Sequence, residues 1–130
     1  MSEDLLENKL SEEMVFHKIV RGDHVVIPEE FRRFMAARNH GQVTWMIVGK
    51  RNGVCYIACF DTYGLKKSRY SMMNTYVECE IPDGRGRIQL QEWQRDLAKI
   101  KRQTVIAPSP DLQNFEIWNK NSFEKAYKPK

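Results

Sequence analysis

The sequence predicts a mixed α+β protein, mostly β, in which two tandem copies of one small unit intertwine as a pseudo-dimeric barrel. Two observations support this fold class. The order strand, glycine-containing turn, strand, helix, hairpin and short helix occurs in residues 14–65 and again in residues 76–127, with Val25 and Ile88 at matching positions. Each copy is also too small to bury its own strands, so the two copies should share one core around a pseudo-twofold axis.

The first copy opens with two short strands joined by a tight turn. Residues 14–20 and 25–27 are rich in apolar and β-branched residues, as strands usually are. The turn between them, residues 21–24, contains Gly22, which permits backbone angles that residues with a Cβ avoid. We therefore expect a strand, a turn and a second strand here, and the same arrangement in the second copy.

A helix follows the second strand. Pro28 suits the first position of a helix, and the two glutamates after it lie favourably at the positive end of the helix dipole. The helix should end near residues 39–41, where Asn-His-Gly follows the last apolar positions. Its expected apolar stripe consists of Phe31, Phe34 and Met35.

A hairpin and a short helix complete the first copy. Residues 43–50 and 54–60 are apolar strands, and the Asn-Gly pair at residues 52–53 between them is among the strongest hairpin signals. Asp61 has a side chain that can accept a hydrogen bond from the backbone of a following helical turn. We expect it to cap a short helix that reaches Leu65.

The second copy repeats this order. Residues 77–81 alternate apolar and acidic side chains, the pattern of a strand with one buried and one exposed face. Two glycines in the turn at residues 82–87 interrupt the alternation, which resumes at Ile88. The helix that follows has an expected apolar face of Leu90, Trp93, Leu97 and Ile100. The remaining strands and the closing helix are expected over residues 104–107, 114–118 and 122–127. All three tryptophans lie on apolar faces of these expected elements and should pack in the core: Trp45, Trp93 and Trp118.

Three segments lie outside the two copies. Residues 1–13 are acidic, with only three leucines to bury, and should form an arm or a short helix that packs on a neighbour. Residues 66–75 begin with a basic stretch and should link the two copies. Residues 128–130 form a tail.

The net charge of +4 is unevenly distributed along the chain. Residues 1–65 contain 8 Lys or Arg and 9 Asp or Glu, whereas residues 66–130 contain 13 and 8. The basic excess of the second half suggests an anionic partner, although such a balance is also common on an ordinary soluble surface.

The three cysteines indicate neither a metal site nor a disulfide framework. They are odd in number, and they have no Cys-x-x-Cys spacing and no nearby pair of histidines. We interpret them as reduced thiols in the core, and we expect no metal and no cofactor. The first fifteen residues include five carboxylates and lack the basic start of a secretory signal, and no later stretch is long and apolar enough for a membrane span. A cytoplasmic protein without a membrane partner is therefore expected.

The turn at residues 82–87 is the strongest candidate for a binding site. It reads Pro-Asp-Gly-Arg-Gly-Arg, and a compact turn would place the guanidinium groups of Arg85 and Arg87 beside each other on its outer face. Such a surface suits phosphate oxygens and the edges of guanine bases. An ordinary solvated hairpin turn is the alternative interpretation.

The same stretch resembles the signature of the MraZ family, bacterial regulators with the swapped-hairpin AbrB fold, whose repeats carry a pattern close to V-E-x-E-L-D-x-x-G-R-I-x-I-P. The positions that match are residues 77–81, Asp83, residues 86–88 and Leu90, with Pro82 as one added residue. A second match, residues 115–119 followed by Phe123 and Glu124, is similar to the family's closing F-E-I-W motif and its short helix. The resemblance implies two tandem swapped-hairpin AbrB-like repeats.

The resemblance also implies a function. A protein of this family would be a transcriptional regulator that binds double-stranded DNA sequence-specifically, at a promoter of division and cell-wall genes. It would be a homo-oligomer, such as a ring of several subunits, in the cytoplasm and associated with the nucleoid.

Carried over position by position, the DNA-reading loops of the family fall on residues 21–24 and 83–87. Only the second loop keeps the Gly-Arg pair, because the first has Asp23 and His24 in its place. A histidine is a weaker, pH-dependent donor than an arginine, and an aspartate repels phosphate, which Arg21 offsets in part. We therefore predict unequal loops, with these DNA-binding residues: Arg85, Arg87, Arg21 and His24.

Two other functions are open at this point. An enzyme would need a nucleophile with a base, and the chain offers only Cys55 or Cys59 with a distant histidine, so neither an enzymatic activity nor a small-molecule substrate is expected. Alternatively, the altered first loop and the absence of the family's helical connector between repeats would suit an oligomeric protein-interaction member of the fold that has lost DNA binding. The cations at the end of the second helix are most simply partners of its negative terminus, with phosphate contact as the alternative: Lys99, Lys101 and Arg102.

Overall fold

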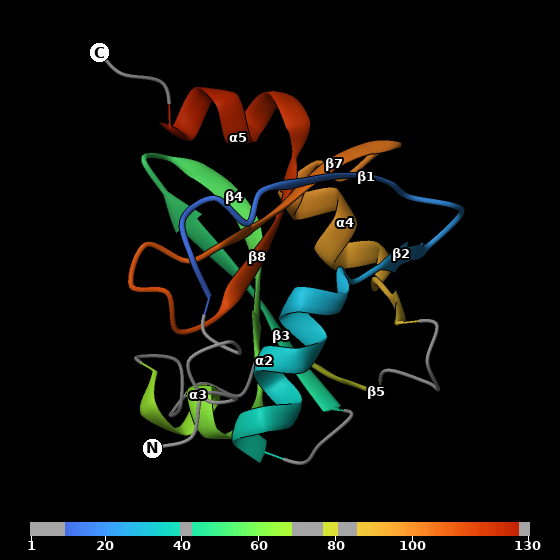
Figure 1. Ribbon diagram of the computed structural model, residues 1–130. Coiled ribbons are helices and arrows are strands. Elements are labelled where there is room, and N and C mark those ends of the chain that lie inside the picture. The colour runs from blue at the N-terminus through green and yellow to red at the C-terminus, as the bar shows by residue number, and fades with distance from the viewer. Residues whose placement is uncertain (1–9, 40–42, 69–76, 81–85, 128–130) are drawn as a thin grey trace.

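The computed structural model describes residues 10–39, 43–68, 77–80 and 86–127. The fold is mixed α+β, with antiparallel strands as its main component (Figure 1). The first half contains β1 (Phe16–Ile19), β2 (His24–Val26), α2 (Glu29–Asn39), β3 (Val43–Arg51), β4 (Val54–Phe60) and α3 (Thr62–Lys67). The second half contains β5 (Val77–Glu80), β6 (Arg87–Gln89), α4 (Glu92–Ala98), β7 (Gln103–Pro108), β8 (Phe115–Asn119) and α5 (Lys120–Tyr127). The predicted order of elements is confirmed.

The strands form two separate sheets rather than the closed barrel that the sequence predicted. Six strands pair in the order β1-β7-β8-β4-β3-β5, and β2 pairs with β6 in a two-stranded ribbon. In the larger sheet the first strand of each half pairs with the hairpin of the other half, β1 with β7 and β5 with β3. Among the described strands a barrel is therefore wrong, because β1 and β5 stand at opposite ends of the six strands and do not pair with each other.

The ribbon is symmetric when the two halves are exchanged. Val25 pairs with Ile88, 63 residues later, at its centre. The amide of Ile27 donates to the carbonyl of Gly86 at 2.8 Å, and the amide of Leu90 donates to the carbonyl of Asp23 at 2.7 Å. These two hydrogen bonds exchange when 63 is added to or subtracted from the residue numbers, so the ribbon residues of the two halves occupy matching positions.

The six-stranded sheet is buried on both faces. Along β4, Ile57 and Cys59 belong to one core cluster, whereas Tyr56, Ala58 and Phe60 belong to the other. The first cluster also contains the inward residues of the ribbon and of α2, and the second contains Leu65 of α3 and Ala126 of α5, which lies across one end of the sheet (Figure 1). This double burial explains why β4 and β8 are almost continuously apolar.

The apolar face predicted for the second helix is wrong. Trp93 and Leu97 are 43% and 53% exposed, whereas Gln94 and Ala98 are buried. The ends of the helix set its rotation: Leu90 is hydrogen-bonded to the first half of the ribbon, and Lys99 takes a left-handed conformation (φ 56°) that ends the helix. With both ends fixed, the positions that face the core are 94 and 98, whatever side chains they carry.

The remaining predictions have mixed outcomes. Trp118 is fully buried, as expected, and Trp45 is partly buried. The carboxylate of Asp61 accepts a hydrogen bond from the amide of Gly64 and caps α3, as predicted. Cys59 is buried, but Cys55 is only partly so. Lys66 and Lys67 belong to α3 and not to a linker. Outside the described residues lie most of the predicted arm (1–9), the rest of the linker (69–76), the end expected for the first helix (40–42) and the tail (128–130).

Candidate nucleic-acid interface

The ribbon of β2 and β6 brings both glycine turns to one narrow surface. Val25 and Ile88 are buried at its centre, so the residues on either side of them in each strand point outward. His24 lies opposite Gln89, and Val26 lies opposite Arg87. We call these four residues, together with Arg21, the ribbon surface.

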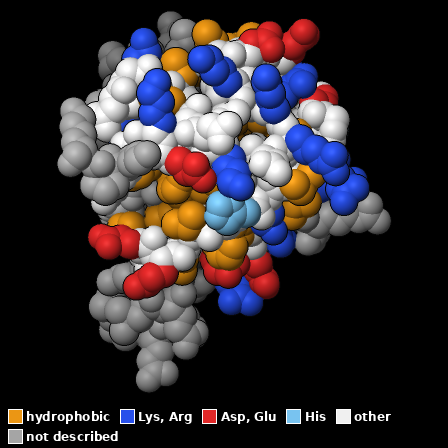
Figure 2. All heavy atoms as spheres, turned by 90° about the horizontal axis from the view of Figure 1, so that it is seen from above, with side chains coloured by type: hydrophobic (Ala, Val, Ile, Leu, Met, Phe, Trp, Pro, Cys, Tyr) orange, Lys and Arg blue, Asp and Glu red, His pale blue; other side chains and the backbone are white. Residues whose placement is uncertain are grey.

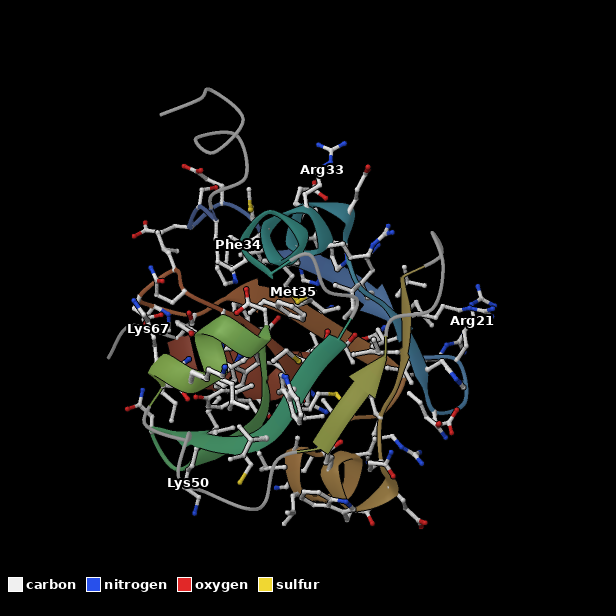
Figure 3. The ribbon with its side chains drawn as sticks, turned by 90° about the horizontal axis from the view of Figure 1, so that it is seen from below. Arg21, Arg33, Phe34, Met35, Lys50 and Lys67 are labelled. Carbon is white, nitrogen blue, oxygen red and sulfur yellow. The ribbon has the colours of Figure 1, made fainter. Side chains whose placement is uncertain are left out.

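The first turn is a tight hairpin that exposes one arginine. Arg21 and His24 exchange two backbone hydrogen bonds, of 2.9 and 3.1 Å, around Gly22 (φ 65°). The Arg21 side chain is exposed, and Figure 3 shows it projecting from the fold on the side away from Lys50 and Lys67. Arg21 is therefore placed to meet an anionic partner, as predicted.

The carboxylate of Asp23 is held between the two strands of the ribbon. Its Oδ2 accepts a hydrogen bond from Nε2 of Gln89 at 2.7 Å, and its Oδ1 lies 2.6 Å from Nδ1 of His24. The hydrogen bond from Gln89, and more weakly the charge of His24, keep the pKa of Asp23 below its usual value despite partial burial. The carboxylate is therefore ionised at neutral pH, and it engages Nδ1 of His24, a residue predicted to contact DNA.

The second turn is closed by an arginine that the sequence motifs did not indicate. Gly86 takes a left-handed conformation (φ 69°), and a Cβ at this position would lie 2.5 Å from Nε of Arg32. That same Nε donates to the carbonyl of Ile27 at 3.1 Å. In the other half, Nε of Arg95 donates to the carbonyl of Leu90 at 3.3 Å. The spacing of 63 residues between Arg32 and Arg95 was the signal that could have revealed both.

Of the two arginines predicted in the second turn, the structure places one. Arg87 is exposed and lies on the ribbon surface opposite Val26. Arg85 lies outside the described residues. The part of the predicted site that the structure describes therefore consists of Arg21, His24 and Arg87.

Two further cations lie beside the first turn although they are distant in sequence. The amide of Val20 donates to the carbonyl of Arg102 at 2.8 Å, which brings the connection between α4 and β7 next to Arg21. Lys101 and Arg102 in this connection are both exposed. Seen from above, lysine and arginine side chains are scattered among acidic ones rather than joined in one patch (Figure 2). The local groups on the ribbon therefore matter more than a broad basic surface.

The largest polar cluster elsewhere in the described residues joins the two halves. Both terminal nitrogens of Arg51 bind the buried carboxylate of Glu116, at 2.7 and 2.6 Å. Arg51 also donates to the hydroxyl groups of Tyr56 and Tyr127, and Trp118 donates to Glu116. Burial and the nearby Glu116 raise the pKa of Tyr127 to about 12, so it stays neutral. Because the carboxylate is fully engaged, this cluster is a structural latch.

The described residues contain no group of three or more His, Cys, Asp or Glu side chains that could hold a metal ion. No helix in the described ranges is long and apolar enough to cross a membrane. No protein-family model matches the chain, and a comparison with curated proteins finds no match. The family relationship indicated by the motifs therefore stays a prediction.

Proposed function

We propose that the chain is a transcriptional regulator of the MraZ type that binds double-stranded DNA sequence-specifically, built from two swapped-hairpin AbrB-like repeats. The observation that carries this proposal is the pairing of β2 with β6, which joins the two turns that carry the motif in one exposed ribbon. The exchange of β1 and β5 between the halves supports the swapped-hairpin interpretation. The target implied by the resemblance is a promoter of division and cell-wall genes.

The dimensions and chemistry of the ribbon suit this function. The major groove of DNA, about 12 Å wide, admits a two-stranded ribbon. Arg87 would reach base edges or phosphate from the middle of the ribbon, because its side chain is exposed and its strand is fixed by Ile88 beneath. Arg21 at the first turn would add a phosphate contact, since a guanidinium binds phosphate oxygens in a bidentate manner.

A homo-oligomer is part of the proposal. A turn with two arginines offers few contacts, and several copies on repeated DNA sites would gain affinity through effective concentration. We expect static light scattering at micromolar concentration to give a mass several times that of the chain. A strictly monomeric mass would contradict the ring and leave a single chain with weak binding.

Alanine substitution of the two arginines in the second turn tests the proposal. Arg85→Ala/Arg87→Ala should lower DNA affinity sharply and flatten the dependence of log affinity on log salt by about 1 for each phosphate that is no longer neutralised. Arg21→Ala/His24→Ala should do less. Lys50→Ala/Lys66→Ala removes the same charge from exposed positions outside the ribbon and should change little. Thermal melting should stay close to that of the wild type in all three variants. Wild-type affinity in the Arg85/Arg87 variant, or greater loss in the Arg21/His24 variant, would contradict the proposal.

A second candidate function is an oligomeric interaction protein of the same fold that no longer binds DNA. The contacts of Asp23 with His24 and Gln89 favour it, since they engage two polar groups of the ribbon. Selection of bound fragments from a random DNA pool separates the two functions. A shared short motif supports the regulator, whereas a folded protein that retains no DNA even at low salt supports the interaction protein.

A further inference from the structure

The ribbon symmetry shows which residues of the two turns correspond. The carbonyls of Asp23 and Gly86 each accept the amide of the residue that follows the opposite strand, Leu90 and Ile27 respectively. Asp23 therefore matches Gly86, and His24 matches Arg87. Where the second turn offers a glycine and an exposed arginine, the first turn offers a carboxylate and an imidazole.

The Asp23 carboxylate resembles a bound phosphate oxygen in its surroundings. It accepts from the amide nitrogen of Gln89 and lies within hydrogen-bond distance of the imidazole of His24, both of which are exposed residues of the ribbon surface. The hydrogen-bonding groups that could meet a phosphate at this turn are thus turned toward a group of the same charge. An approaching phosphate would have to displace the carboxylate and would be repelled by it.

The described segments nearest this turn carry exposed cations. Arg21 precedes the turn, and Lys101 and Arg102 lie on the connection bonded to Val20. Asp23 is therefore the acidic group among neighbours that would otherwise favour phosphate. A single side chain separates a closed turn from one able to bind.

We propose that Asp23 keeps the first turn from binding DNA phosphate, so that each chain binds DNA through its second turn alone. This inference rests on the proposed function. It makes Asp23 a residue that determines how many phosphates one chain engages, and it predicts that the binding geometry of a chain is one-sided even though its ribbon is symmetric.

The test is an increase in binding. Asp23→Gly/His24→Arg copies the residues of the second turn into the first, and it should raise affinity for a short mixed-sequence duplex by about tenfold. The salt dependence should steepen by about 1 for each additional phosphate that is neutralised. Asp23→Asn keeps the shape of the side chain and removes its charge, so it should give a smaller increase even where the double variant folds poorly. Glu124→Gln removes one exposed carboxylate from α5 and serves as the matched control.

The outcomes are separable by fluorescence anisotropy of labelled duplex, with thermal melting of each variant as the check of folding. If the wild type binds and both Asp23 variants bind more tightly than the Glu124 variant, the inference stands. If the wild type binds and the folded Asp23 variants bind no more tightly than the Glu124 variant, the inference is overturned and the proposed function survives. If neither the wild type nor any variant binds at low salt, the proposed function fails and the inference fails with it.

Discussion

The helices α2 and α4 occupy matching places in the two halves but pack differently. Position 31 matches position 94, and there α2 buries Phe31 while α4 buries Gln94. Position 34 matches position 97, and there Phe34 is 7% exposed while Leu97 is 53% exposed. Figure 3 shows Phe34 and Met35 on the side of α2 toward the fold and Arg33 pointing away from it. The chain path thus repeats between the halves, whereas the choice of buried side chains does not.

The inward position of each helix has a different task. Phe31 stacks on Phe115, with ring centroids 4.9 Å apart, and meets Phe16 edge-on at 5.8 Å. Gln94 instead accepts a hydrogen bond from the amide of Gln91 through its Oε1, at 3.2 Å, and caps its own helix. Its Nε2 is buried and has no hydrogen-bond partner among the described residues. α2 therefore stabilises the core by packing, and α4 contributes much less.

Truncation at this matched position should expose the difference most strongly. Phe31→Ala should lower the free energy of unfolding by about 3–5 kcal/mol, the usual cost of removing a buried phenyl ring. Gln94→Met keeps the length of the side chain and removes the unpaired amide, so it should change stability by about 1 kcal/mol or less, in either direction. Urea unfolding followed by circular dichroism measures both. Comparable losses would show that Gln94 contributes as much as Phe31.

A second matched position, 56 and 116, should give an intermediate effect. Ile57 and Ile117 pair in the sheet, so Tyr56 and Glu116 correspond, and both bind Arg51. Glu116→Gln weakens a buried, charge-assisted pair and should cost about 2–3 kcal/mol, whereas Tyr56→Phe removes one hydroxyl group and should cost about 1 kcal/mol. Thermal melting of the two variants checks the order, and a larger loss for Tyr56→Phe would reverse the assignment of the latch to Glu116.

The smallest effect is expected on the outer side of α4. Leu97→Ala removes a side chain that is already half exposed, so the free energy of unfolding should fall by less than about 0.5 kcal/mol. The same unfolding measurement applies, with Phe31→Ala as the reference for a core position. A loss of several kcal/mol would mean that Leu97 is buried in solution, by another part of the chain or by a second copy.

Local signals predicted most of the elements. The Asn-Gly pair predicted the β3–β4 hairpin, and Asn52 and Gly53 both take left-handed angles there. Asp61 caps its helix as expected, and the strand alternation around Ile88 places it in the core. These features depend on residues close in sequence, because backbone angles, caps and side-chain alternation are decided within a few positions.

The candidate site was only partly predictable. The exposure of Arg21 and Arg87 follows from turn residues and strand alternation. The hydrogen bond between Asp23 and Gln89, which lie 66 residues apart, depends on the register of the ribbon, and the position of Arg32 over Gly86 depends on how α2 packs. No local pattern specifies either contact, since each joins residues from different halves of the chain.

The sequence by itself determined the order of the elements, the two glycine turns and the inequality of their side chains, since these are properties of neighbouring residues. Only the tertiary structure decided that the strands form an open sheet and a separate ribbon, and that α4 turns Gln94 inward and Trp93 outward. The physical reason is that the rotation of a short helix and the closure of a sheet are set by contacts at their ends. In α4 the bonds at Leu90 and the left-handed Lys99 outweighed the preference of apolar side chains for the core.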